Sequence, residues 1–377
     1  MAAANEKGAG QALMLAALAL PGLDAQAQAL PDVSTFSIGL LHYQDEQPGL
    51  KRVQVNAPAV QLSLPLAGQW LLEGGAVLDH LSGATPRYHT AVSGASRMDE
   101  QRKAGDLHVT RYIGHASVGV GAALSNENDY RSRAYTVSAA LASEDRNTTG
   151  ALALGVSNDS ISPVNGRVVD ERRHSTEIMA SLEQVLGQND VLKADLTHTR
   201  GRGYFSDPYK LADNRPRARN SDALLLRWNH ALDHAAALRL HYRYFRDSFG
   251  IRAHTVGAEY ARPLAGGWVL TPSLRLYTQS AADFYFDPVY DPVLGAPYPP
   301  GYRFGGNAPS TADQRMAAFG AATAGLRVAR DLGAGWSAYV KAEQYRQLSS
   351  WRWFGSGSPG LARFDARLWQ VGAIKQW

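Results

Sequence analysis

The sequence closes with Arg367-Leu368-Trp369-Gln370-Val371-Gly372-Ala373-Ile374-Lys375-Gln376-Trp377, and the fold prediction starts from this stretch. Every second residue counted back from Trp377 belongs to a mostly apolar set, and the residues between them form a mixed polar set. Successive side chains of a β-strand point to opposite faces, so the pattern predicts a strand with one apolar face. A final aromatic residue suits the closing strand of a transmembrane β-barrel, and Lys375 lies close enough to the end to reach the membrane interface. The alternative is the edge strand of an ordinary sheet.

The rest of the chain repeats this alternation in segments of about ten residues, for example 117–124, 152–157, 192–197, 238–245 and 336–343. Their period is two residues, not the 3.6 of a helix. A soluble strand averages about five or six residues, whereas a tilted strand that crosses a bilayer needs about nine to eleven. The segments therefore predict an all-β fold, a transmembrane antiparallel up-and-down β-barrel of about sixteen strands, with both termini on the periplasmic side.

Segment 106–114 leaves the strand count open. Arg111 in this segment falls on the same face as the apolar Val109 and Ile113, so the segment fits a membrane strand imperfectly. We therefore keep about fourteen to eighteen strands as the range.

The connections between the segments are of two kinds. Three short ones, 65–70, 263–268 and 331–336, place Gly in a tight turn just before a Trp. We expect short turns on the periplasmic side and long loops outside the cell, as in outer-membrane barrels. The tryptophans expected at the membrane interface are Trp70, Trp268, Trp336, Trp369 and Trp377. The long loops are expected at 81–105, 159–174, 201–220, 280–313 and 348–363, of which 81–105 and 280–313 are candidates to plug the lumen.

Length and composition agree with one large barrel. The chain has 377 residues, of which 45% are apolar and 19% charged, and no linker or domain boundary is visible. The net charge of +4 comes without a basic run, which argues against nucleic-acid binding. The absence of cysteine excludes disulfides, thiolate metal sites and thiol nucleophiles.

The start of the chain has the features of a secretory signal. An apolar run from Ala12 to Leu23 follows Lys7 and precedes the small-x-small stretch Ala25-Gln26-Ala27. We predict a signal peptide at 1–27 and a single barrel domain at 28–377, the alternative for the first segment being a buried core helix. No later apolar run reaches the roughly 18 residues that a membrane-spanning helix needs.

Several stretches resemble a known family. They are 93–96 (Ser-Gly-Ala-Ser), 106–112, 204–210 (with Ser206-Asp207-Pro208-Tyr209-Lys210) and Arg215-Pro216. Together they are similar to a bacterial family catalogued only as a domain of unknown function, whose members are predicted outer-membrane β-barrels of Gram-negative bacteria. The resemblance implies the fold and an outer-membrane location, and it carries over no activity and no functional residue. The partners expected of such a barrel are the lipid bilayer and the barrel-assembly machinery, which would engage the C-terminal strand.

Charged residues of the alternating segments are the best functional lead. A Lys or Arg on the lipid face near the bilayer midplane costs about 2–4 kcal/mol, so we expect these charges to face inward. The candidate lumen-lining residues are Glu73, Asp79, Glu177, Glu183, Lys193, Asp195, Arg227, Arg239, Arg243, Glu259, Arg275, Lys341 and Glu343. Arg227, Arg239 and Arg243 lie on neighbouring predicted strands and could form a basic ladder.

Two functions fit these charges. A wet pore would use them to filter small solutes, as a porin-like channel or an accessory to an export system. An interior salt-bridge network would instead fill a non-conducting structural or assembly barrel. A membrane hydrolase would need a nucleophile beside a histidine. His108, His198, His241 and His254 lie on predicted strands without an assignable serine, so no catalytic residue is predicted.

The remaining motifs predict turns and not sites. Asp283, Asp287 and Asp291 in one loop and the cluster at 126–129 in another carry oxygen ligands suited to Ca²⁺, but their spacing matches no EF-hand, and we predict neither a metal site nor a cofactor. The stretch 355–360 matches the dinucleotide fingerprint in letters only, because its Pro-Gly cannot start a helix. Asp207-Pro208-Tyr209 with Lys210 is expected to form a turn in an external loop, the alternative being a loop folded into the lumen as a constriction.

Overall fold

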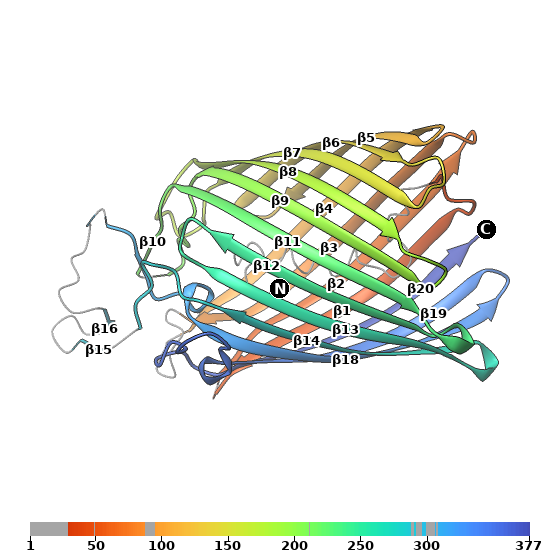
Figure 1. Ribbon diagram of the computed structural model, residues 1–377. Coiled ribbons are helices and arrows are strands. Elements are labelled where there is room, and N and C mark those ends of the chain that lie inside the picture. Colours follow the sequence, from red (N-terminus) through yellow and green to blue (C-terminus); the bar gives the residue numbers. More distant parts are fainter. Residues whose placement is uncertain are drawn as a thin grey trace.

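The computed structural model describes residues 29–48, 50–86, 95–210, 212–287, 290–291, 296–298, 306 and 308–377. In this part of the chain, sixteen strands form one closed antiparallel barrel, as predicted (Figure 1). The barrel strands are β1 (Thr35–Gln47), β2 (Leu50–Leu66), β3 (Trp70–Pro86), β4 (Ala95–Ile113), β5 (Ala116–Asn126), β6 (Tyr130–Ala142), β7 (Thr148–Ile161), β8 (Glu171–Val185), β9 (Asp190–Gly203), β11 (Ala218–Ala231), β12 (Ala237–Asp247), β13 (Arg252–Leu264), β14 (Trp268–Gln279), β18 (Phe319–Gly333), β19 (Trp336–Leu348) and β20 (Phe364–Gln376). The predicted signal peptide at 1–27 lies outside the described residues.

Smaller elements lie in the connections. The short strand pairs are β10 (Asp213–Asn214) with β17 (Ser310–Thr311), and β15 (Tyr290–Asp291) with β16 (Ala296–Pro297). Single turns of 3₁₀-helix occur at η1 (Asp233–Ala235), η2 (Ala265–Gly267), η3 (Gln314–Met316) and η4 (Ser349–Trp351). No helix among the described residues is long and apolar enough to cross a bilayer.

The C-terminal strand closes the barrel. Strand β20 pairs antiparallel with β1, so that Thr35 lies opposite Gln376 and Leu41 lies opposite Gln370. Closure leaves no sheet edge with unpaired backbone groups, which a lipid environment could not satisfy. The alternative of an ordinary edge strand is therefore wrong for this stretch.

The two ends of the barrel differ in their connections. The short-turn end, where the C-terminus lies, has the tight connections 67–69, 114–115, 143–147, 186–189, 232–236, 265–267 and 334–335 (Figure 1). Gly68, Gly266 and Gly335 in the three Gly-to-Trp turns have φ values of 67°, 76° and 75°, a conformation that only glycine adopts without strain. The predicted placement of glycine in these turns is confirmed.

The long-loop end differs from the prediction in one place. The loop expected at 81–105 is wrong, because β3 continues to Pro86 and β4 begins at Ala95, while 87–94 lies outside the described residues. The other long connections occupy 162–170, 204–217, 280–318 and 349–363, within or close to the expected ranges. Toward the long-loop end of β3 and β4, polar residues replace the apolar residues of the sequence. The alternation that predicts a membrane strand therefore stops there, although the two strands remain hydrogen-bonded to each other.

Alternate residues of each strand face lipid or lumen. Leu107, Val120, Leu152, Leu182 and Leu196 lie exposed on the outward face, while small and polar side chains alternate with them on the inward face. Arg111 is outward, with its guanidinium carbon 5.3 Å from the centre of the Trp70 ring at the short-turn end. This position explains its sequence pattern, because a cation can lie outward where an aromatic residue marks the membrane interface.

Candidate functional site

The predicted charged residues share one face of the barrel wall. By strand parity and register, the structure places all thirteen inward, opposite the exposed apolar face: Glu73, Asp79, Glu177, Glu183, Lys193, Asp195, Arg227, Arg239, Arg243, Glu259, Arg275, Lys341 and Glu343. Their role in lining a solute pathway stays a prediction.

Most of these charges lie in close pairs of opposite sign. The nitrogen-to-oxygen distances are 3.1 Å for Arg227–Asp195, 3.8 Å for Arg239–Glu259, 3.9 Å for Lys193–Glu183 and 2.9 Å for Lys341–Glu343. On the other side of the barrel, Arg102 donates from Nε to Asp79 at 2.6 Å. The inner wall is therefore locally balanced in charge.

The predicted basic ladder does not form. Arg227 lies opposite His241 in the β11–β12 register, but its side chain pairs with Asp195 on β9. Arg239 turns the other way, to Glu259 on β13. An arginine gains more from an adjacent carboxylate than from a row of like charges, so the three side chains separate.

Arg243 differs from the paired arginines. Within the described residues it has no ion pair with a carboxylate, and its guanidinium carbon lies 5.1 Å from the ring centre of Phe245. An arginine without a carboxylate partner keeps its full charge available to a solute.

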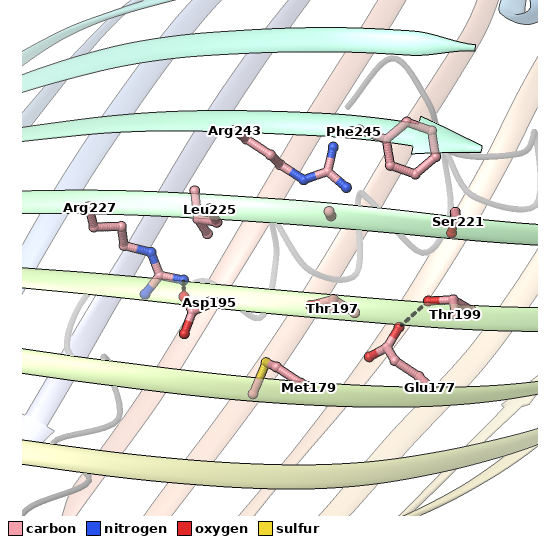
Figure 2. A pocket seen from close by; sticks show the side chains of 11 residues that line it. Glu177, Met179, Asp195, Thr197, Thr199, Ser221, Leu225, Arg227, Arg243 and Phe245 are labelled. Atoms are coloured by element: carbon pink, nitrogen blue, oxygen red, sulfur yellow. Dashed lines mark hydrogen bonds and ion pairs between the residues drawn. The ribbon is translucent and has the colours of Figure 1, made fainter. Parts of the chain in front are cut away.

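A hollow of about 300 Å³ lies on the inner wall beside Arg243 (Figure 2). It extends over β8, β9, β11 and β12, and its lining residues are Glu177, Met179, Asp195, Thr197, Thr199, Ser221, Ala223, Leu225, Arg227, Arg243 and Phe245. Sequence reasoning named only the charged members of this set. The others share their parity, so the same alternation could have identified them, but the hollow itself arises from side-chain sizes on four separate strands.

The hollow combines donors, acceptors and apolar surface. The Thr199 hydroxyl donates to Glu177 at 3.1 Å, and the Ser181 hydroxyl donates to Asp195 at 2.6 Å. Phe245 and Leu225 provide apolar contact beside the Arg243 guanidinium. Such a surface suits a small hydroxylated solute with an anionic group, which would meet Arg243.

The four histidines considered for catalysis are divided between the two faces. His108 and His241 are inward, and each ring lies against glycines of the next strand, Gly119 and Gly121 for His108 and Gly257 for His241. His198 and His254 are outward, bonded to Asp222 at 2.8 Å and to the Tyr242 hydroxyl at 2.8 Å. Within the described part of the chain, none of the four is hydrogen-bonded to a serine.

The predicted turn at Asp207 is confirmed. The Asp207 carboxylate accepts from the Tyr209 backbone N–H at 2.9 Å, and the Lys210 N–H bonds to the Asp207 carbonyl at 3.2 Å. Among the described residues there is no group of three or more His, Asp or Glu that could hold a metal. The Asp287 carboxylate instead accepts from the Gly360 N–H at 3.2 Å, joining two loops.

A buried ionic cluster joins the loops at the long-loop end. Arg215 donates to Asp213 at 2.9 Å and to Asp313 at 2.7 Å, and Arg315 donates to Asp207 at 2.8 Å. Burial by itself would lower the pKa of Arg215, but the adjacent Asp213 and Asp313 carboxylates raise it overall. The cluster thus connects 204–217 to the loop before β18, a contact between distant residues that sequence periodicity could not predict.

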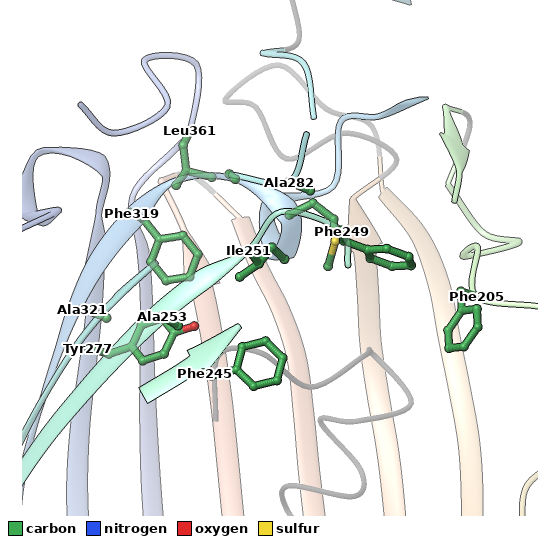
Figure 3. Close-up of a cluster of buried hydrophobic side chains, with 12 residues drawn as sticks. Phe205, Phe245, Phe249, Ile251, Ala253, Tyr277, Ala282, Phe319, Ala321 and Leu361 are labelled. Carbon is green, nitrogen blue, oxygen red and sulfur yellow. The ribbon is translucent and has the colours of Figure 1, made fainter. Parts of the chain in front are cut away.

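An apolar cluster reinforces this junction (Figure 3). Phe249 is almost fully buried, with its ring centre 6.0 Å from that of Phe205 and 5.1 Å from that of Phe284. Phe319 and Leu361 belong to the same cluster. Four connections at the long-loop end therefore pack together as one unit.

The predicted interface tryptophans are all exposed on the outward face. Trp70, Trp268 and Trp336 begin strands at the short-turn end, and Arg330 lies over the Trp268 ring at 5.0 Å and Lys375 over the Trp336 ring at 5.7 Å. Trp377 lies at the same end, and Trp369 lies farther along β20, opposite His42. Their contact with the membrane interface stays a prediction.

Comparison with known proteins supports the fold. No curated protein matches the sequence. Among solved structures, CdiB from Acinetobacter baumannii has a TM-score of 0.50 at 11% identity, covering 89% of this chain but only 60% of that one. A bacterial polysaccharide outer membrane secretin has a TM-score of 0.50 at 8% identity, covering 91% of this chain and 98% of that one. OccK1 (OpdK) from Pseudomonas aeruginosa has a TM-score of 0.44 at 10% identity, covering 93% of this chain and 100% of that one.

The two similarities with a TM-score of 0.50 show the fold of outer-membrane barrels and no particular activity. The sequence also matches a family model, at residues 10–99, 90–174 and 167–367, which together span most of the chain. The chain belongs to the family described as a protein of unknown function (DUF3570), in agreement with the resemblance seen in its motifs.

Proposed function

We propose that the protein is an outer-membrane channel that passes small hydrophilic solutes, with the β8–β13 wall as its selective surface. The supporting observation is the exposure of inward charges. The side chains of Arg227, Arg239 and Glu259 are 43%, 50% and 45% exposed, although all three belong to ion pairs. In a barrel filled by a salt-bridge network, such side chains would be buried. A sixteen-strand barrel has room for a wet lumen, and exposed charges are what such a lumen requires.

On the opposite wall of the barrel, the inward ion pair between Asp79 and Arg102 is buried. The Asp79 and Arg102 side chains are only 6% and 5% exposed, and an apolar group that includes Leu41, Val55 and Val77 lies nearby on the inward face. We infer that a solute moves along the β8–β13 side, where the hollow lies. Arg243 would give this path a local preference for anions, because the other arginines of the hollow wall are balanced by carboxylates.

Planar-bilayer recording of the purified protein tests this proposal. The full chain should form channels, and Arg243→Ala should shift the reversal potential in a KCl gradient toward cations. One unit charge at about 6 Å in water changes the local anion concentration by about threefold, so the chloride-to-potassium permeability ratio should fall by about that factor at low salt.

Arg246→Ala is the matched control, because Arg246 lies on the same strand but faces outward and pairs with Asp222 at 3.0 Å. It should leave the reversal potential unchanged. Equal effects of the two substitutions would contradict a role for Arg243 in the lumen, and absence of any conductance would contradict the channel itself.

One observation favours a second candidate, a non-conducting structural barrel. The loop cluster around Phe249 and Arg215 packs four connections together at the long-loop end. If these loops close the mouth, the wild-type protein should show no current while variants that loosen the cluster do. The same recordings therefore separate the two roles.

A further inference from the structure

Five arginines gather on the outward face of β6, β8 and β9 near the long-loop end. They are Arg131, Arg133, Arg172, Arg200 and Arg202, and we call them the outer arginine cluster. All five are exposed. Arg131 and Arg133 alternate with Tyr130 and Ser132, which are buried on the inward face, and the strand register places the other three on the same outward face.

The strand register places these side chains in rows. Arg131 lies opposite Ser160 of β7, which lies opposite Arg172, so the two arginines are about 10 Å apart at two strand spacings. In the next row, Arg133 connects through Asn158 and His174 to Arg202, at about 14 Å. Arg200 lies on the same face two residues farther along β9.

The described part of the chain provides no compensating acid for the cluster. Within the described residues, none of the five arginines has an ion pair or hydrogen bond to a carboxylate. On the neighbouring strand β11, the outward carboxylate of Asp222 is bonded to His198 at 2.8 Å and to Arg246 at 3.0 Å. Glu171 pairs with Arg217 at 2.6 Å. Like charges on adjacent strands repel each other, so the cluster is stabilised when an anion binds between its members.

The cluster lies just beyond the apolar residues on the outward face of the barrel. Tyr135 and Val137 follow Arg133 on the outward face of β6, and Ile178 and Leu196 lie below the arginines on β8 and β9, all exposed. The change from apolar to cationic takes one outward position on β6, two on β9 and three on β8, which is about 7–20 Å along a strand. An arginine just beyond the apolar band lies at the level of lipid headgroups.

The other outward arginines are arranged differently. At the short-turn end, Arg111 and Arg330 each lie over a separate tryptophan ring, at 5.3 and 5.0 Å. Near β19 and β20, Arg346 and Arg363 both pair with Asp365. Arg252 and Arg262 are also exposed outward without an acidic partner, but among the described outward residues a group of five such arginines occurs on β6–β9 alone.

We propose that the outer arginine cluster binds the phosphate groups of a phosphorylated lipid headgroup in the outer leaflet. The guanidinium fork matches a phosphate with two parallel hydrogen bonds, and the row spacing admits two phosphates at once. The apolar residues below the cluster would contact the acyl chains of the same lipid. The assignment depends on the barrel lying in a bilayer, and it does not depend on conduction.

Lipid titration of the full-length protein in detergent, followed by native mass spectrometry, tests the proposal. The probes are bis-phosphorylated lipid A, its monophosphoryl form and phosphatidylethanolamine. The wild type should bind the bis-phosphorylated lipid more tightly than the monophosphoryl form, and phosphatidylethanolamine most weakly. An arginine near an anionic lipid surface contributes about fivefold in affinity, so Arg133→Gln with Arg172→Gln and Arg202→Gln should weaken binding of the bis-phosphorylated lipid about 100-fold.

Arg111→Gln with Arg330→Gln is the matched control, because it removes outward arginines from the other end of the barrel. This variant should bind within about twofold of the wild type. Heat-modifiable migration on SDS gels checks that each variant forms the barrel. Equal lipid affinity of the wild type and the triple variant would overturn the proposal, as would binding that ignores the number of phosphates. If inorganic phosphate competes at the concentration at which the lipid binds, the cluster is a free-anion site and the lipid assignment is wrong.

Discussion

Substituting Arg215 by methionine should release the loops at the long-loop end while leaving the barrel intact. The Arg215 side chain is 1% exposed, and it bridges Asp213 on its own loop and Asp313 on the loop before β18. Its backbone N–H also bonds to the Ser206 hydroxyl at 2.9 Å, which holds the loop in place. Methionine keeps most of the buried volume but removes the charge and the hydrogen bonds to Asp213 and Asp313.

The magnitude follows from what each carboxylate keeps. Removing one partner of a buried ion pair costs about 3–5 kcal/mol. Asp313 keeps Arg315, whose Nε donates to it at 2.8 Å, so the main loss falls on Asp213, whose side chain is fully buried. We therefore expect the lower figure, about 3 kcal/mol, which shifts the loop-opening equilibrium by about two powers of ten.

Limited proteolysis of the protein in liposomes measures this shift, because the cleavage rate follows the open population when opening is fast. Arg215→Met should be cut in the loops about 100-fold faster, with unchanged heat-modifiable migration. Arg217→Met is the control. Arg217 is 62% exposed and pairs with Glu171, so its loss should cost at most about 1 kcal/mol. Asp213→Asn added to Arg215→Met should recover most of the protection. Cleavage of Arg215→Met at the wild-type rate would refute the reasoning.

Two further predictions concern packing. A Cβ on Gly257 would overlap the His241 ring, so Gly257→Ala should push that ring into the lumen and lower the single-channel conductance, whereas Gly150→Ala, where a Cβ meets nothing within 4 Å, should not. Phe249→Ala removes a side chain that is 1% exposed, at a cost of about 3–5 kcal/mol, and should speed loop cleavage as Arg215→Met does. Protection equal to the wild type would show that the loops dock without Phe249.

The fold and the facing of the charges could be predicted because both depend on local periodicity. Successive residues of a strand face opposite sides of the sheet, and charged side chains are unfavourable on the lipid side. Because Leu196 faces lipid, the preceding Asp195 faces the lumen. The pairing of β1 with β20 follows from closure and needs no further information. These inferences use only neighbours in sequence.

Contacts between residues far apart in the sequence could not be predicted, because periodicity relates only residues that are close in the sequence. Arg215 and Asp313 belong to different loops, and no period relates them. The partner of Arg227 also depended on register, since Asp195 lies on one neighbouring strand and the arginines of the expected ladder lie on the other. The hollow beside Arg243 required the sizes of side chains on four strands, which a single-strand pattern does not contain.

The incorrect loop at 81–105 and the unrecognised arginine cluster have one cause, which is strand length. Strand β4 has 19 residues, which at about 3.3 Å each and a tilt of about 45° rise about 44 Å, whereas the apolar band of an outer-membrane barrel is about 25 Å tall. A surplus of this length extends beyond an apolar band of that height. The polar residues of this surplus look like a loop in sequence but continue the hydrogen-bonded ladder. Strand β9, with 14 residues, rises about 33 Å by the same estimate, which carries Arg200 and Arg202 past the apolar band and into the headgroup layer. The long strands thus place the arginine cluster where a phosphorylated lipid would lie, and they hold the loop cluster beyond it.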